Sequence, residues 1–197
     1  MRVSQNSATK VVGVLALQGA FNSHERMLSE LGVATQEVRT PQDLAVVDAL
    51  IMPGGESTTM SQLLESSELF EPIKKVIHEG MPVFGTCAGM ILLAKTIFDG
   101  RDDQVSFNAI DIEVQRNAYG RQVDSFEAEI QVERLNDAFH AVFIRAPRIV
   151  NLSPDVEVLA KFGSDVVLAR QKNVLVAAFH PELSEDKRIH EMFVKEI

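Results

Sequence analysis

The chain has little of what several protein classes need: it has one cysteine, no tryptophan, one tyrosine and no cluster of lysine and arginine. A single cysteine excludes an internal disulfide and favours a reducing cytoplasm. The absence of C-x-x-C and H-E-x-x-H patterns leaves a structural zinc site without support. A formal net charge of −9 without a basic cluster argues against nucleic acid as a partner, and the apolar runs are too short to cross a membrane. We therefore expect a cytoplasmic protein that binds neither nucleic acid nor membrane.

What is present is a composition typical of a folded domain, with 46% hydrophobic and 24% charged residues among 197. This length suits one domain, and no linker rich in Pro, Gly or Ser divides the chain. We expect residues 11–197 to form that single domain. Residues 1–10 are polar, lack the apolar centre of a signal peptide, and are predicted to form a loose N-terminal extension.

The first half alternates short apolar runs with amphipathic segments. The runs at 11–17, 34–38, 49–52 and 81–84 predict strands. Helices are predicted between them: one capped by Asn22 or Ser23 and ended by Gly32, one over 58–64, one over 69–78, and one over 90–95 after the last strand. Strand and helix in alternation predict an α/β fold, a mostly parallel central sheet with helices on both faces.

The second half has a different pattern, with strand candidates at 109–114, 126–132, 141–144, 156–162, 166–170 and 174–179 and few long helices between them. Such a run predicts an antiparallel portion attached to the parallel sheet, with the last strand returning to the main sheet. A final helix over 184–195 is predicted to begin at a Ser184 cap.

The lone cysteine, Cys87, lies between glycines in Gly85-Thr86-Cys87-Ala88-Gly89, after an apolar strand and before a helical segment. This is the layout of a nucleophile elbow, in which a strand turns sharply into a helix and flanking glycines relieve crowding at the bend. The N–H groups at a helix start favour thiolate over thiol. Most single cysteines are buried structural residues, so the elbow needs support from elsewhere in the chain.

That support comes from His180, which ends the apolar run 174–179 and is followed by Pro181 and Glu182. Active sites of open α/β sheets lie at the carboxyl ends of parallel strands. Pro181 favours an extended conformation for His180, which would place Glu182 on the same side and let its carboxylate fix the imidazole tautomer. The other histidines (His24, His78, His140 and His190) are interpreted as surface residues.

A third segment, 53–59, follows the strand at 49–52 and contains Gly54, Gly55 and Glu56 before a Ser/Thr cluster that is predicted to cap the next helix. It lacks the lysine of a phosphate loop and the spacing of a dinucleotide-binding motif. An N–H from Gly54 or Gly55, together with that of Ala88, could form an oxyanion hole. A plain Gly-Gly turn is the alternative.

These three segments, in this order, resemble the class I (triad-type) glutamine amidotransferases. The strings at 13–20, 115–126, 143–147 and 179–183 further resemble the glutaminase subunits of pyridoxal 5′-phosphate synthase, over a match from about residue 11 to the C-terminus. The elbow and His-Pro-Glu are shared by all triad amidotransferases, whereas Gly-Arg-Gln-Val-Asp-Ser-Phe and Phe-Ile-Arg-Ala-Pro are typical of this subfamily.

The resemblance implies hydrolysis of L-glutamine to glutamate and ammonia through a γ-glutamyl thioester, with a Cys87, His180 and Glu182 triad and no cofactor or metal. It implies a glutamine site lined by Gly54, Gly55, Glu56, Arg116, Ile144 and Arg145. It also implies a synthase (lyase) subunit as partner in a hetero-oligomer, which receives the ammonia. Gln18, at the end of the first strand, is a candidate for that interface, with a polar loop residue as the equal alternative.

Two other interpretations remain open. A cysteine hydrolase or redox-linked protein of the chaperone and glyoxalase-like type would share the elbow, although it would not need the Gly-Gly loop and His-Pro-Glu together. A catalytically silent scaffold subunit would only dock, but the presence of Cys87, His180 and Glu182 argues against it.

Overall fold

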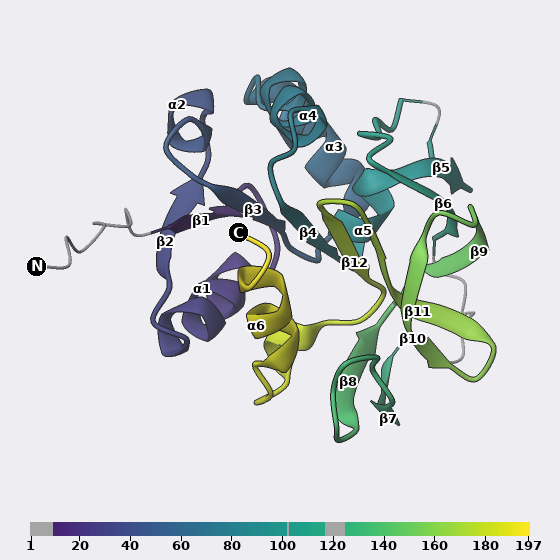
Figure 1. Cartoon of the computed structure of the whole chain (residues 1–197). Helices are drawn as coiled ribbons and strands as arrows, with labels where there is room; N and C mark the ends of the chain where they lie inside the picture. The colour runs from purple at the N-terminus through teal and green to yellow at the C-terminus, as the bar shows by residue number, and fades with distance from the viewer. Residues whose placement is uncertain (1–9, 102, 117–124) are drawn as a thin grey trace, which may run out of the picture.

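The computed structural model describes residues 10–101, 103–116 and 125–197, built around a mixed seven-stranded sheet (Figure 1). Its strands lie in the order β10-β11-β12-β4-β3-β1-β2. Their bounds are β1 Val11–Leu15, β2 Ala34–Val38, β3 Ala49–Met52, β4 Val83–Thr86, β10 Glu157–Phe162, β11 Asp165–Gln171 and β12 Val174–Ala177. The predicted extension at residues 1–10 lies, except for Lys10, outside the described residues.

The five strands β12, β4, β3, β1 and β2 pair in parallel, and β3, β4 and β12 are buried along their whole length. Apolar runs without alternation are typical of such doubly covered strands. In Figure 1, α1 and α6 lie on one side of this sheet, and α3 and α4 on the other. The helices are α1 Phe21–Glu30, α2 Pro41–Leu44, α3 Ser57–Ser66, α4 Phe70–His78, α5 Ala88–Leu93 and α6 Arg188–Val194, with a 3₁₀ turn, η1, at Pro181–Leu183. The predicted parallel α/β core is confirmed.

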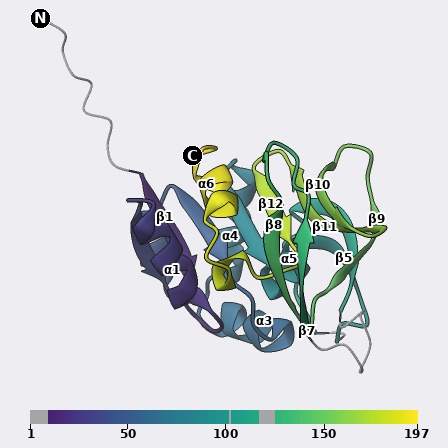
Figure 2. The ribbon, with the colours of Figure 1, turned by 90° about the horizontal axis from the view of Figure 1, so that it is seen from below.

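The second half supplies the antiparallel portion, also as predicted. β11 extends the main sheet antiparallel to β12, and β10 pairs antiparallel with β11, while β12 itself returns beside β4. A three-stranded sheet, β5-β6-β9, and a hairpin, β7-β8, complete it (Figure 2). Their bounds are β5 Ala94–Phe98, β6 Ile110–Gln115, β7 Ser125–Ile130, β8 Phe139–Ile144 and β9 Arg148–Leu152.

Several predicted boundaries are wrong, for local reasons. The cap of α1 is Ala20 rather than Asn22 or Ser23, although Gly32, at φ 73°, does follow the helix end. The last helix begins at Arg188, because the Ser184 hydroxyl accepts the N–H of Asp186 in a turn outside the helix. The helix predicted over 90–95 ends earlier, since β5 pairs with β6 from residue 94 onward. The elements α2, β5 and β9 were not predicted.

The sheet order places three loops side by side. β4 lies between β3 and β12, and all three run in the same direction, so the segments after Met52, Thr86 and Ala177 leave the same sheet edge. Within the ranges described, no helix is long and apolar enough to span a bilayer.

Candidate active site at the carboxyl edge of the sheet

Cys87 sits on a strained turn between β4 and α5. Its φ of 49° and ψ of −103° are unusual for a residue with a Cβ, and its N–H donates to the Ala177 carbonyl of β12 at 2.9 Å. Gly89 allows the turn to pack closely, because a Cβ there would lie 2.9 Å from the carbonyl carbon of Met52. The predicted elbow geometry is confirmed, and it presents the sulfur at the start of a helix.

His180 and Glu182 form a buried pair beside this turn. Nδ1 of His180 lies 2.7 Å from Oε1 of Glu182, whose side chain has no exposed surface. The predicted pairing is confirmed, although the reason given for it is wrong. Residues 181–183 form a 3₁₀ turn rather than an extended segment, and this turn brings the carboxylate back under the ring.

The surroundings of His180 favour its protonated form. Burial lowers its pKa, but hydrogen bonding with the Cys87 and Glu182 side chains, and their negative charges, outweigh burial and raise the pKa to about 10. The Cys87 sulfur also lies 3.8 Å from the Ile144 carbonyl, to which it donates. The imidazolium form of His180 is therefore favoured beside this sulfur.

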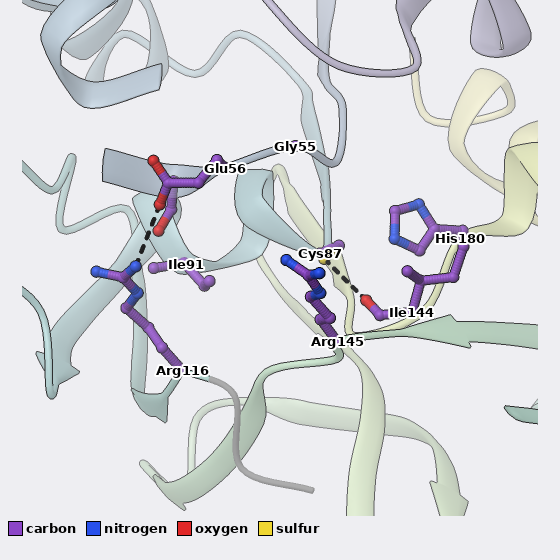
Figure 3. A pocket seen from close by; sticks show the side chains of 9 residues that line it. Gly55, Glu56, Cys87, Ile91, Arg116, Ile144, Arg145 and His180 are labelled. Carbon is purple, nitrogen blue, oxygen red and sulfur yellow. Dashed lines mark hydrogen bonds and ion pairs between the residues drawn. The ribbon is translucent and has the colours of Figure 1, made fainter. Parts of the chain in front are cut away.

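These groups open onto a pocket of about 310 Å³ (Figure 3). Its lining comprises Gly55, Glu56, Ser57, Cys87, Ile91, Arg116, Ile144, Arg145 and His180. Five of the six residues predicted to bind glutamine are among them. The sixth, Gly54, lies behind the pocket, where a Cβ would come 3.3 Å from that of Cys87 and collide with the His180 ring.

Glu56 and Arg116 lie together on one side of the pocket, with Nη2 of Arg116 3.2 Å from Oε1 of Glu56. Glu56 accepts the N–H groups of Thr58 and Thr59, so it caps α3 in place of the predicted Ser/Thr cluster. Burial raises its pKa, but these hydrogen bonds prevail and lower the pKa to about 2. Arg116 also donates to the Thr58 hydroxyl (3.0 Å) and to Gln104 (2.8 Å).

Arg145 differs from Arg116 because it has no ion pair within the part of the chain that the structure describes. It follows β8 directly, at a φ of 43°, and is exposed. In the view of Figure 3 its side chain extends from the strand end toward Cys87. Of the two arginines in the pocket, Arg116 is therefore paired with a carboxylate, and Arg145 is the available cation.

Gln18 and the Gly-Gly loop meet next to the pocket. A Cβ on Gly55 would lie 3.2 Å from Oε1 of Gln18, a buried oxygen that has no hydrogen-bond partner within the described ranges. Gly19 approaches the Gly54 carbonyl too closely to accept a side chain. The carboxyl end of β1 is thus packed onto the loop, and Gln18 lines no part of the pocket itself.

The interpretation of His24 and His190 as surface residues is wrong, whereas His78 is exposed and His140 partly exposed, as expected of surface residues. His24 on α1 and His190 on α6 have no exposed surface, and Nδ1 of His24 lies 2.9 Å from Nε2 of His190. Nε2 of His24 lies 3.4 Å from Oε2 of Glu182. Their charged neighbours in the sequence point elsewhere, because one face of each short helix packs on the sheet.

Comparison with protein families identifies the group to which this site belongs. A model described as the SNO glutamine amidotransferase family matches residues 14–197. The chain belongs to this family. Family membership agrees with the resemblance seen in the sequence motifs.

Individual proteins similar to this chain carry names that agree with this family assignment. A protein of Herpetosiphon aurantiacus named "Pyridoxal 5'-phosphate synthase subunit PdxT" is 56% identical over 93% of this chain and 98% of its own length. A protein of the same name from Thermosipho africanus is 54% identical over 93% of this chain and 96% of its own. A crystal structure titled as a glutamine amidotransferase aligns with a TM-score of 0.89 at 47% identity, covering 94% of this chain and 97% of that one.

A more distant structure, PurLQS from Thermotoga maritima, shares the fold with a TM-score of 0.69 at 15% identity, over 95% of this chain and 98% of that one. Three residues of the site were not predicted from the sequence: Ser57 and Ile91, which line the pocket, and His24, which lies behind it. Ser57 belongs to the predicted 53–59 segment and could have been included. No local pattern marks His24, because only the packing of α1 beside η1 brings it to Glu182.

Proposed function

We propose that this chain is the glutaminase subunit of a pyridoxal 5′-phosphate synthase, hydrolysing L-glutamine to L-glutamate and ammonia. The observation that carries the proposal is the convergence of Cys87 and the His180–Glu182 pair on one pocket, in a chain of the glutamine amidotransferase family. A thiol on a strained elbow, a histidine and a buried carboxylate are the groups that acyl transfer needs.

In this proposal the Cys87 thiolate attacks the side-chain amide carbon of glutamine, and His180 holds the proton that the thiol has lost. His180 then gives that proton to the departing nitrogen, which leaves as ammonia from a γ-glutamyl thioester. Water, losing a proton to His180, attacks the thioester and releases glutamate and the thiol. Glu182 accepts the Nδ1–H of His180 throughout and keeps Nε2 directed at the reacting atoms.

The negative oxygen of each tetrahedral intermediate needs two donors. The N–H of Ala88 at the start of α5, and an N–H of Gly54 or Gly55, are the proposed oxyanion hole. The loop has two adjacent glycines, whose backbone is conformationally permissive, which supports the idea that its N–H groups adopt the productive orientation only when a synthase surface holds the loop. Gln18, packed against Gly55, is the proposed link to that surface.

The charges of the pocket suit a free amino acid. Arg145, the available cation, is proposed to bind the α-carboxylate, and Glu56, held by Arg116, is proposed to accept the α-ammonium. Ile144 would cover the aliphatic chain. The synthase partner is proposed from the relatives' names, and a cytoplasmic location from the need to keep Cys87 reduced.

The test measures ammonia release from glutamine by the chain alone and with the synthase subunit. We expect slow turnover alone, a clear rise with the synthase, and none by Cys87→Ala in either case. Equal rates with and without the synthase would contradict the loop argument. If a γ-glutamyl affinity label leaves Cys87 unmodified even in the complex, the silent scaffold is the better account.

A further inference from the structure

Two buried histidines continue the line of polar groups behind the proposed triad. His24 on α1 and His190 on α6 are both fully buried, on the side of the main sheet where these two helices lie (Figure 1). Burying an imidazole costs free energy unless its two ring nitrogens find hydrogen-bond partners. The partners of His24 therefore indicate what the ring does.

Each nitrogen of His24 has a polar neighbour. Nδ1 lies 2.9 Å from Nε2 of His190, and Nε2 lies 3.3 Å from the Thr86 hydroxyl and 3.4 Å from Oε2 of Glu182. That carboxylate oxygen has no hydrogen-bond partner within the described residues, while the other one, Oε1, receives His180. His24 is thus the donor best placed to serve the second oxygen of Glu182.

One arrangement of protons satisfies these contacts. His24 carries its proton on Nε2 and directs it to Glu182, because a carboxylate can only accept. Its Nδ1 then accepts the Nε2–H of His190, which leaves Nδ1 of His190 without a proton. That last atom is the buried nitrogen without a partner in the described residues, and a bare acceptor is easier to leave unpaired than an N–H donor.

We propose that His24 is a positioning residue for the reaction: its Nε2–H binds Oε2 of Glu182 and fixes the carboxylate plane, so that Oε1 stays aligned with Nδ1 of His180. The inference rests on the proposed glutaminase function. A carboxylate held at one oxygen can rotate about its terminal bond, whereas one held at both cannot. The imidazole of His180 is oriented in turn, although His24 touches neither the substrate nor the thiol.

Burial agrees with a neutral donor. Burial is the largest effect on His24 and lowers its pKa. The negative charge of Glu182 raises this pKa and the positive charge of His180 lowers it, and the net result is a lowered pKa. For His190, burial and the electrostatic effect of His24 lower the pKa to about 3, although the negative charge of Glu182 acts to raise it. These groups, with Thr86, are the polar and titratable neighbours of the ring, so His24 acts at neutral pH through its N–H dipole rather than as a cation.

The kinetic test uses three substitutions of one residue in the complex with the synthase. A glutamine at 24 can place its amide N–H where Nε2 was, an asparagine reaches only the position of Nδ1, and leucine offers no donor. We expect His24→Leu and His24→Asn to lower kcat about ten- to a hundredfold, the range seen for outer hydrogen-bond partners of metal ligands. His24→Gln should recover most of the loss, and KM for glutamine should change little in all three.

A matched control separates positioning from packing. His190→Leu removes a second fully buried imidazole that contacts His24 but not Glu182, and we expect a smaller loss of kcat than in His24→Leu. Equal losses in the two leucine variants, or an asparagine variant as active as the glutamine variant, would overturn the proposal. So would a folded His24→Leu protein, checked by thermal unfolding, that keeps the unsubstituted chain's kcat.

A second measurement needs neither activity nor a substitution. Nitrogen-15 NMR of histidine-labelled protein reports which ring nitrogen carries the proton, and we expect His24 to be neutral with the proton on Nε2 between pH 6 and 8. A proton on Nδ1, or on both nitrogens, would overturn the proposal even if the protein were inactive on glutamine. A chain with the expected tautomer but no glutaminase activity would instead count against the proposed function.

Discussion

Gly54 and His180 touch in a way that leaves no room for a side chain at position 54. A Cβ there would collide with Cε1 of the His180 ring, lie 3.0 Å from its Nδ1 and 3.3 Å from the Cβ of Cys87. The glycine is therefore needed for the ring to occupy its place, apart from any role of its N–H.

The first prediction follows from this contact. Gly54→Ala must displace the His180 ring from its position, and a displacement of about 1 Å at a reacting group costs on the order of a hundredfold in rate. We expect kcat for glutamine hydrolysis to fall by about that factor while the protein stays folded, because the shift is local. Steady-state kinetics and thermal unfolding measure the two effects.

The control is Gly163→Ala, at a φ of 60° with no atom within 4 Å of the added Cβ. It should lower stability by roughly 1 kcal/mol through backbone strain and leave kcat unchanged. A Gly54→Ala enzyme with normal kcat would show that the ring is not confined as described.

The second prediction ranks the two members of the buried pair. His180→Asn removes the proton acceptor and donor, so we expect no measurable glutaminase activity. Glu182→Gln keeps the imidazole but loses its alignment, and should leave a residual rate, about 10³- to 10⁴-fold below the starting enzyme by analogy with serine proteases. Ammonia release in the presence of the synthase measures both. A lower rate for Glu182→Gln than for His180→Asn would reverse the assigned roles.

Much of the fold could be predicted from the sequence, because the central strands β1, β3 and β12 are apolar runs without alternation. The parallel core strands and the elbow at Cys87 depend on local composition and were found on that basis. The β9 strand, Arg148–Leu152, was missed because its three apolar residues do not alternate with polar ones and only Ile149 is buried. The short helix α2 was missed despite a capping box formed by Thr40 and Asp43.

The residues of the site likewise divide into those that local sequence patterns predict and those that they do not. Cys87, His180 and the Gly-Gly loop could be placed together, since each follows a strand of one parallel sheet. The burial of His24 and His190 could not, because it depends on how α1 and α6 pack against that sheet rather than on any local pattern. Long-range packing, which no single segment encodes, decides which polar residues become buried partners.

The third prediction concerns the available cation. If Arg145 binds the carboxylate of glutamine equally in the ground and transition states, Arg145→Met should raise KM by about tenfold and change kcat little. Arg148→Met is the matched control, because this arginine lies nearby in the sequence but pairs with Asp165 outside the pocket. Its KM should stay at the starting value. A fall in kcat with KM unchanged in Arg145→Met would assign that arginine to the transition state instead.

The fourth prediction is a pH dependence of stability. An unfolded histidine takes up a proton near its ordinary pKa of 6.5, whereas burial lowers the pKa of His190 to about 3 in the folded chain. Between these values the unfolded state binds more protons, so the free energy of unfolding falls as the pH falls through this window. His190 alone contributes up to about 1.4 kcal/mol per pH unit, and His24, whose pKa burial also lowers, adds in the same direction.

His190→Leu tests this dependence directly. At pH 7 it should be neutral or stabilising, because an apolar side chain replaces a ring whose Nδ1 has no partner in the described residues. Between pH 6 and 4.5 its free energy of unfolding, from denaturant titrations, should fall less steeply than that of the unsubstituted chain. Identical slopes for the His190 variant and the unsubstituted chain would mean that the imidazole of His190 is protonated equally in both states, contrary to its burial.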